Sequence, residues 1–126
     1  MNITPEKLDE LIRIVYLAGI EIIKIYKKKV TKKYKSDNTP VTNADIKAND
    51  IICNGLKKHF PDISIVSEEQ IKKGKPAQRF WLVDPLDGTK EFLKGNGEYT
   101  VNIGLIENKK PVFGIIYMPT KNKLYF

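Results

Sequence analysis

The stretch WLVDPLDGTKEF, residues 81–92, joins a short apolar run to two aspartates that stand three positions apart. Pro85 restricts the preceding Asp84 to an extended conformation. The Asp87-Gly88 pair that follows is typical of a tight reversal of the chain. The stretch therefore predicts a strand that ends just before these carboxylates and delivers both of them into a turn.

Such a turn could bring four oxygen-bearing groups into one volume: the carboxylates of Asp84 and Asp87, the backbone carbonyl of Leu86 and the hydroxyl of Thr89. Oxygen-only ligand sets suit hard cations such as Mg²⁺. An ordinary Asp-Gly turn, in which Asp84 caps backbone groups, is an equally good interpretation of this stretch alone. Acidic residues elsewhere in the chain must decide between the two.

A second acidic pair, Glu68-Glu69, follows the predicted strand Ile63–Ser67, just as Asp84 follows the predicted strand Phe80–Val83. If the two strands are neighbours, their ends lie about 5–10 Å apart. Glu68 could then bridge to the same cations. The alternative is a solvated pair at the start of a loop, and for this pair taken alone it is the better interpretation.

A third acidic position lies in the stretch VTNAD, residues 41–45. Thr42 is typical of the residue that caps a helix start, and Asp45 stands three positions further on, close to a capping-box arrangement. At the start of that helix, Asp45 could also lie beside the carboxylates and hold a metal-bound water or orient Thr89. The two roles are compatible, and both stay open.

The remaining pattern predicts two helices followed by a sheet. A helix start at Thr4 and Pro5 is followed by apolar residues at helical spacing to about Tyr26. Residues 35–41 predict a loop, and a second helix runs from about Thr42 until Pro61 stops it. The predicted strands are Ile63–Ser67, Phe80–Val83, Tyr99–Ile106 and Val112–Tyr117, with another apolar run at Leu124–Phe126. This order predicts one α/β or α+β unit over residues 1–126.

The composition is that of a soluble globular protein, with 126 residues, 41% hydrophobic and 29% charged. Charged residues interrupt the apolar stretch 11–25, which excludes a membrane span and a signal peptide there. The lone cysteine, Cys53, rules out an internal disulfide and fits the reducing cytoplasm. His59 is expected in the last turn of the second helix, where its side chain points another way than that of Cys53, six residues before it, so the two cannot form a catalytic dyad.

The net charge of +7 comes mainly from lysine, and seven lysines fall between positions 24 and 35. We interpret them as a solvated helix end whose positive charge complements the helix dipole. Specific nucleic-acid binding is disfavoured, because no aromatic residues are spaced as a stacking platform. A weak peripheral association with the inner face of a membrane stays open for this basic segment.

Taken together, WLVDPLDGT, the SEE before it and VTNAD resemble the lithium-sensitive, Mg²⁺-dependent phosphatases of the inositol monophosphatase family. Lys90-Glu91-Phe92 and NGEYTVNIGLI, residues 96–106, are similar to the CysQ-like branch that acts on 3'(2'),5'-bisphosphate nucleotides. The resemblance runs along nearly the whole chain. It implies the layered sugar-phosphatase fold of that family, in which two N-terminal helices pack on a mostly antiparallel sheet.

The resemblance also implies a role for each motif residue. The implied metal ligands, for two or three Mg²⁺ ions, are Glu68, Asp84, Asp87 and the Leu86 carbonyl. The implied catalytic residues are Thr89, Asp45 and Glu68. The residues implied to contact the substrate phosphate are Gly88, Thr89 and Glu68, with Glu69 and Thr42 supporting the site from outside.

By resemblance, the reaction is hydrolysis of 3'-phosphoadenosine 5'-phosphate to AMP and phosphate through in-line attack of a metal-activated water. An inositol monophosphate or another sugar phosphate is the alternative substrate. Family members run to roughly twice this length, and their second half holds a W-D-x-A motif whose aspartate completes the metal site. Trp81 is the only tryptophan here. We therefore expect the N-terminal half of such an enzyme, which is either a non-catalytic remnant or needs a separately encoded C-terminal half.

Overall fold

The computed structural model describes residues 3–28, 32–34, 40–66, 78–88 and 99–126. Within these ranges two helices and seven strands follow one another along the chain. Their bounds are α1 Pro5–Lys28, β1 Lys32–Tyr34, β2 Pro40–Thr42, α2 Asn43–His59, β3 Ser64–Val66, β4 Arg79–Asp87, β5 Thr100–Glu107, β6 Lys110–Met118 and β7 Lys123–Tyr125. Both helices precede the large sheet, as the sequence predicts.

Helix α1 begins where the capping signal places it. The Thr4 hydroxyl accepts a hydrogen bond from the Lys7 backbone N–H at 3.2 Å, which satisfies one free donor of the first turn. Pro5 occupies the first helical position. The helix continues two residues past the predicted end at Tyr26, to Lys28.

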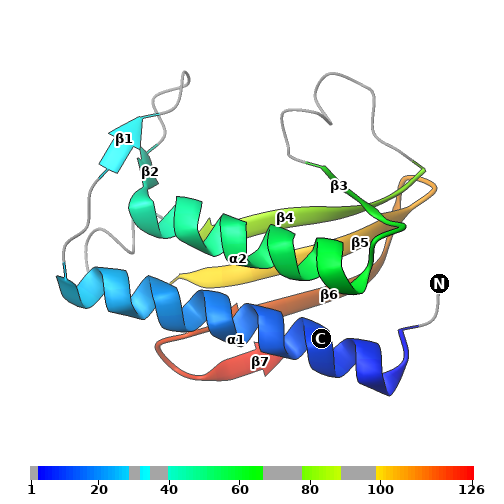
Figure 1. Ribbon diagram of the computed structural model, residues 1–126, viewed down its shortest axis with the longest axis horizontal. Coiled ribbons are helices and arrows are strands. Elements are labelled where there is room, and N and C mark those ends of the chain that lie inside the picture. The colour runs from blue at the N-terminus through cyan, green and yellow to red at the C-terminus, as the bar shows by residue number, and fades with distance from the viewer. Residues whose placement is uncertain (1–2, 29–31, 35–39, 67–77, 89–98) are drawn as a thin grey trace.

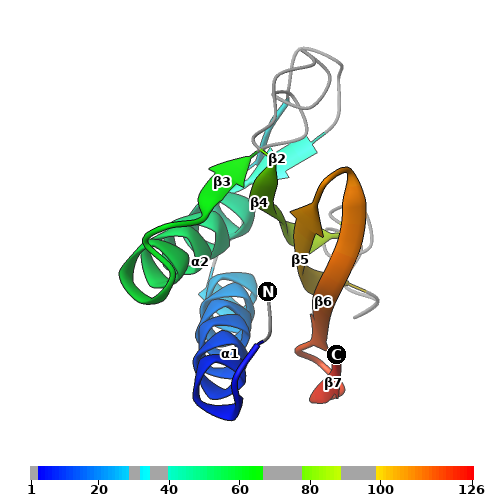
Figure 2. The same cartoon turned by 90° about the vertical axis from the view of Figure 1, so that its right-hand side faces the viewer.

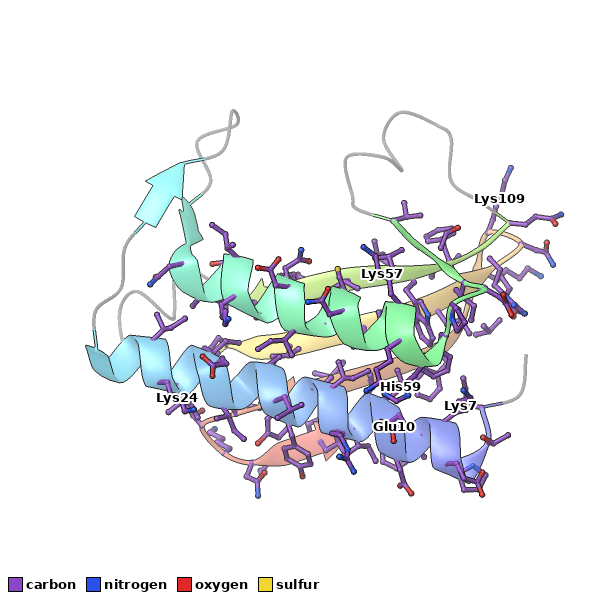
Figure 3. All side chains as sticks on the ribbon, viewed as in Figure 1. Lys7, Glu10, Lys24, Lys57, His59 and Lys109 are labelled. Carbon is purple, nitrogen blue, oxygen red and sulfur yellow. The ribbon has the colours of Figure 1, made fainter. Side chains whose placement is uncertain are left out.

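Helix α2 packs closely against α1 through a glycine. A Cβ atom at Gly55 would lie only 2.7 Å from the Ile14 side chain, so the absence of a side chain there lets the two helices approach. At one end of the pair, Lys7 Nζ donates to the His59 carbonyl at 2.8 Å, and His59 Nε2 lies 3.1 Å from Glu10 Oε2. Figure 3 shows these three residues where α1 begins and α2 ends. The contacts fix the end of α2 to the start of α1.

The large sheet has the strand order β3-β4-β5-β6-β7. Strands β3 and β4 are parallel, and the other neighbours are antiparallel. The prediction of two helices on a mostly antiparallel sheet is therefore confirmed. The predicted loop at 35–41 is wrong at its end, because Pro40–Thr42 forms β2 and pairs with β1. Proline can open such a strand because the first residue need not donate to the ladder.

Both helices cover the same face of the large sheet (Figures 1 and 2). The side chains that pack beneath them are buried and include Trp81, Val101, Ile103, Leu105 and Ile115. The opposite face, which we call the open face, carries Leu82, Asn102, Ile116 and Tyr125, as the strand register requires. Ile116 and Tyr125 are 41% and 54% exposed. The apolar core thus lies between the helices and the sheet.

Candidate metal centre

Strand β4 runs through the motif that we expected to form a turn. The sequence predicts that the strand ends at Val83, whereas β4 continues to Asp87. Pairing with β5 extends the strand, since Asp84 lies opposite Asn102 and Asp87 lies opposite Thr100. The chain leaves the strand only at Gly88, whose φ of 89° is one that residues with a side chain rarely adopt.

A bulge in β4 decides which way the two aspartates point. Asp84 and Asp87 are three positions apart, but their partners Asn102 and Thr100 are only two apart, so β4 holds one extra residue here. Side chains of a regular strand alternate between faces, and residues three apart would lie on opposite faces. The extra residue brings both aspartates to the face of Asn102 and Thr100.

Burial agrees with this register. Asp84 and Asp87 are both exposed, whereas Leu86 between them is 2% exposed and belongs to the core under the helices. The two carboxylates therefore stand on the open face, anchored from the other side by the Leu86 side chain. Two neighbouring carboxylates exposed on one face provide oxygen ligands only, which fits a hard divalent cation such as Mg²⁺.

Two polar residues of β5, Thr100 and Asn102, lie on the same face as the aspartates. They were not among the predicted site residues. The Asn102 side-chain amide Nδ2 donates to the Thr100 hydroxyl at 2.9 Å. In the sequence these two alternate with buried Val101 and Ile103. That alternation indicates an outward-facing pair, but only the register with β4 places the pair next to the aspartates.

The condition on which the role of Glu68 depends, that its preceding strand neighbours the strand of Asp84, is met. Strands β3 and β4 pair in parallel, with Val66 opposite Leu82. Because parallel neighbours run in the same direction, β3 ends beside the part of β4 that leads to the aspartates. Glu68 and Glu69 themselves lie outside the described residues, as does Thr89.

Asp45 lies in the first turn of α2, partly exposed, and α2 packs on β4. Among the residues that the structure describes, no three acidic, histidine or cysteine side chains gather as a metal site would require. Asp45 therefore does not form such a group with Asp84 and Asp87 in the described part of the chain, and the metal roles of all three stay predictions. The Thr42 side chain is not among the described parts, so the supporting role predicted for it stays a prediction.

The remaining reactive side chains have other partners. His59 lies against Glu10, and the Cys53 thiol contacts the Asn49 side-chain carbonyl at 3.6 Å. Burial raises the pKa of the Cys53 thiol, partly offset by the nearby Lys57 charge. A thiol with a raised pKa and no histidine partner is a poor nucleophile. His59 and Cys53 thus have different partners in the structure.

The positive charge is spread over several elements. Lys24 pairs with Glu21 at 3.5 Å, while Lys57 and Lys109 stand on α2 and on the β5–β6 turn (Figure 3). Most of the lysine-rich segment 24–35 has no described side chains. Within the described residues, neither helix combines the length and the apolar character that crossing a membrane requires.

Comparison with known proteins gives consistent matches. The model of the inositol monophosphatase family matches residues 5–126. The chain is 46% identical over 123 residues to 3'(2'),5'-bisphosphate nucleotidase CysQ of Escherichia coli strain K12, covering 94% of this chain and 50% of that protein. The chain spans about half the length of the curated relatives it matches.

Solved structures agree. The crystal structure of CysQ from Bacteroides thetaiotaomicron superposes with a TM-score of 0.72 and 41% identity, over 93% of this chain and 44% of that one. The IMPase of Thermotoga maritima gives a TM-score of 0.81 at 26% identity, over 94% of this chain and 46% of that one. The layered fold expected from the motifs is therefore shown.

Proposed function

Because the chain belongs to the inositol monophosphatase family, we propose that it forms the N-terminal half of a Mg²⁺-dependent phosphomonoesterase for 3'(2'),5'-bisphosphate nucleotides. Such an enzyme would convert 3'-phosphoadenosine 5'-phosphate to AMP and phosphate. The identity of 46% to the CysQ nucleotidase of E. coli over 123 residues supports this substrate class. We expect phosphatase activity to require the half of the relatives that this chain does not span.

One structural observation carries the proposal. The bulge in β4 turns Asp84 and Asp87 to the same face, beside the end of β3, whose chain continues toward Glu68. The backbone of the motif therefore places two neighbouring carboxylates on one face of the sheet. A purely structural Asp-Gly turn would need no such placement.

The proposed chemistry assigns a task to each motif residue. Asp84, Asp87, the Leu86 carbonyl and Glu68 would hold Mg²⁺, which when bound lowers the pKa of a water and neutralises charge on the leaving oxygen. Asp45 and Thr89 would orient the attacking water. Backbone and side-chain groups of Gly88 and Thr89 would contact the phosphate, with Thr42 and Glu69 supporting the site from outside.

A direct assay tests the substrate class. The chain would be joined to the second half of the E. coli relative, and phosphate release would be measured from 3'-phosphoadenosine 5'-phosphate, inositol 1-phosphate and fructose 1,6-bisphosphate. We expect the nucleotide to give the highest kcat/KM. Preference for inositol 1-phosphate or the sugar bisphosphate would replace the nucleotidase assignment by the sugar-phosphatase alternative.

The metal role is tested in the same protein. Asp84→Asn should lower kcat by at least about 100-fold, because a lost metal ligand weakens the stabilisation of transition-state charge. Asp62→Asn is the matched control, since Asp62 is an exposed aspartate in the turn between α2 and β3. Equal activity of the Asp84→Asn variant and the parent would remove the metal assignment.

We further propose that the open face binds a separately supplied C-terminal half. Ile116 and Tyr125 lie there as paired neighbours, 41% and 54% exposed, and exposed apolar patches commonly mark interaction sites. Co-expression with the second half of the E. coli relative should give a stable complex with phosphatase activity. Ile116→Lys should prevent assembly, whereas Ile46→Lys, at a 50% exposed position on α2, should not. Failure of the parent chain to assemble would support the non-catalytic remnant instead.

A further inference from the structure

We propose that Thr100 and Asn102 of β5 are positioning residues for the metal-binding carboxylates, a role that rests on the proposed function. Thr100 stands opposite Asp87 and Asn102 stands opposite Asp84 in the ladder. The structure assigns these two neutral side chains to the site by register. They would act on the cation only through the aspartates.

Distance and face support this role. Side chains directly opposite each other on an antiparallel pair have Cβ atoms about 4.5–5.5 Å apart. Such a separation allows a hydroxyl or an amide to reach a carboxylate across the strands. The bond of 2.9 Å from Asn102 Nδ2 to Thr100 Oγ1 shows that these two side chains lie on one face and are already linked.

The donors and acceptors of Asn102 and Thr100 decide which hydrogen bonds these side chains can still donate. The Asn102 amide nitrogen carries two protons, and the bond to Thr100 uses one of them. The Thr100 oxygen accepts this bond, so its own proton is left to be donated. Carboxylates only accept hydrogen bonds when ionised, and the carboxylates opposite these donors belong to Asp84 and Asp87.

The consequence is a restrained pair of ligands. A hydrogen bond to a metal-binding carboxylate fixes the orientation of that carboxylate, and removing such a partner typically weakens metal binding about 10–100-fold. Without donors beside them, two exposed aspartates would sample several side-chain rotamers. The pair would therefore raise cation affinity by holding Asp84 and Asp87 in the binding arrangement.

The test measures Mn²⁺ binding to the 126-residue chain from the electron paramagnetic resonance signal of free Mn²⁺. Thr100→Val and Asn102→Leu remove the polar groups but keep the branching of each side chain, and Thr100→Ser keeps the hydroxyl. We expect the first two variants to bind Mn²⁺ at least about 10-fold more weakly than the parent. Thr100→Ser should bind within about 3-fold of the parent, because the donor remains. Urea unfolding of each variant shows that the fold is kept.

The outcomes separate this inference from the proposed function. If the parent binds Mn²⁺ and the Thr100→Val and Asn102→Leu variants bind it equally well, the positioning role is wrong and the metal site stands. If Thr100→Ser loses as much affinity as Thr100→Val, the hydroxyl is not the active group and the role is wrong. If the parent itself binds no Mn²⁺, Asp84 and Asp87 hold no cation in this half and the positioning role is wrong, whereas the proposed function is decided separately by the phosphatase assay of the joined protein.

Discussion

Asp84 and Asp87 lie on the same face of the sheet although three positions separate them along β4. The cause is one extra residue in β4 relative to β5, and Leu86 buries its side chain on the opposite face. A regular strand would have sent one of the two carboxylates into the apolar core, at a cost of several kcal/mol. The bulge therefore lets this stretch bury Leu86 in the core and present both carboxylates on one face.

The first prediction concerns the repulsion between these two carboxylates. Asp87→Asn should raise the free energy of unfolding in metal-free buffer at pH 7 by a few tenths of a kcal/mol, because one of two like charges is removed. The measurement is urea unfolding in the presence of EDTA. The gain should shrink in high salt, which screens exposed charges.

Asp62→Asn serves as the control for this prediction, because Asp62 is also exposed but belongs to the turn between α2 and β3. It should leave the free energy of unfolding nearly unchanged. A loss of stability in the Asp87→Asn variant, with no change in the control, would mean that repulsion from Asp84 does not outweigh the favourable contacts of the Asp87 carboxylate without metal. The assignment of the pair as cation ligands would then lose its electrostatic support.

The sequence predicted the helices well, because helix signals are local. The hydroxyl of Thr4, the proline after it and the helical spacing of apolar residues placed the start of α1 correctly. From the sequence one could also ask whether β3 and β4 are neighbours, because Glu68 can join the site only if they are. The contact between Glu10 and His59 could not be predicted from the sequence, because it depends on how α1 and α2 pack against each other.

The course of β4 shows where local reasoning fails. Asp, Pro and Gly in DPLDG are turn formers, so the sequence predicted that the strand stops at Val83. Ladder pairing with β5 outweighs that preference as far as Asp87. Register between strands cannot be read from one segment, and for the same reason Thr100 and Asn102 did not figure among the predicted site residues.

The second prediction concerns the contact between α1 and α2. Gly55→Ala should lower the free energy of unfolding by about 1–3 kcal/mol, because the new Cβ would lie 2.7 and 2.8 Å from atoms of Ile14. The higher helix propensity of alanine, worth up to about 1 kcal/mol, offsets part of this cost. Urea unfolding measures the difference.

Gly114→Ala is the control for this contact, since a Cβ atom there has only the Ile103 carbonyl, at 4.0 Å. We expect it to stay within about 0.5 kcal/mol of the parent. Combining Gly55→Ala with Ile14→Val should cost less than the sum of the two single changes, because valine lacks one methyl at the contact. Additive costs would show that Ile14 is not the obstacle.

The third prediction concerns the turn between β6 and β7. The Tyr117 hydroxyl donates to Asn122 Oδ1 at 2.9 Å, and Asn122 holds a φ of 49° in that turn. Tyr117→Phe should lower the free energy of unfolding by about 1 kcal/mol, the usual worth of such a bond. Tyr125→Phe, at a 54% exposed position, should change it little. Equal effects of both substitutions would show that the bond does not stabilise the turn.

The last prediction concerns pH and the Cys53 thiol. Burial is the largest cause that raises the pKa of Cys53, the Asp50 charge adds to it, and the Lys57 charge opposes it. As pH rises through the ordinary thiol pKa, the unfolded chain loses this proton while the folded protein keeps it. The contribution of Cys53 to the free energy of unfolding is therefore largest at low pH. It falls as pH rises from the ordinary pKa of the thiol to the raised one.

The Cys53→Ala variant isolates this contribution, because all other titrating groups stay the same. The free energy of unfolding of the parent, relative to that of the variant, should decline as pH rises above the ordinary thiol pKa of about 8.5. Measurement is by urea unfolding at a series of pH values under reducing conditions. The folded thiol should also react with a disulfide reagent at pH 8 more slowly than the thiol of the urea-unfolded chain. If parent and variant have parallel pH profiles, and the folded and unfolded thiols react equally fast, then folding does not raise the pKa of Cys53.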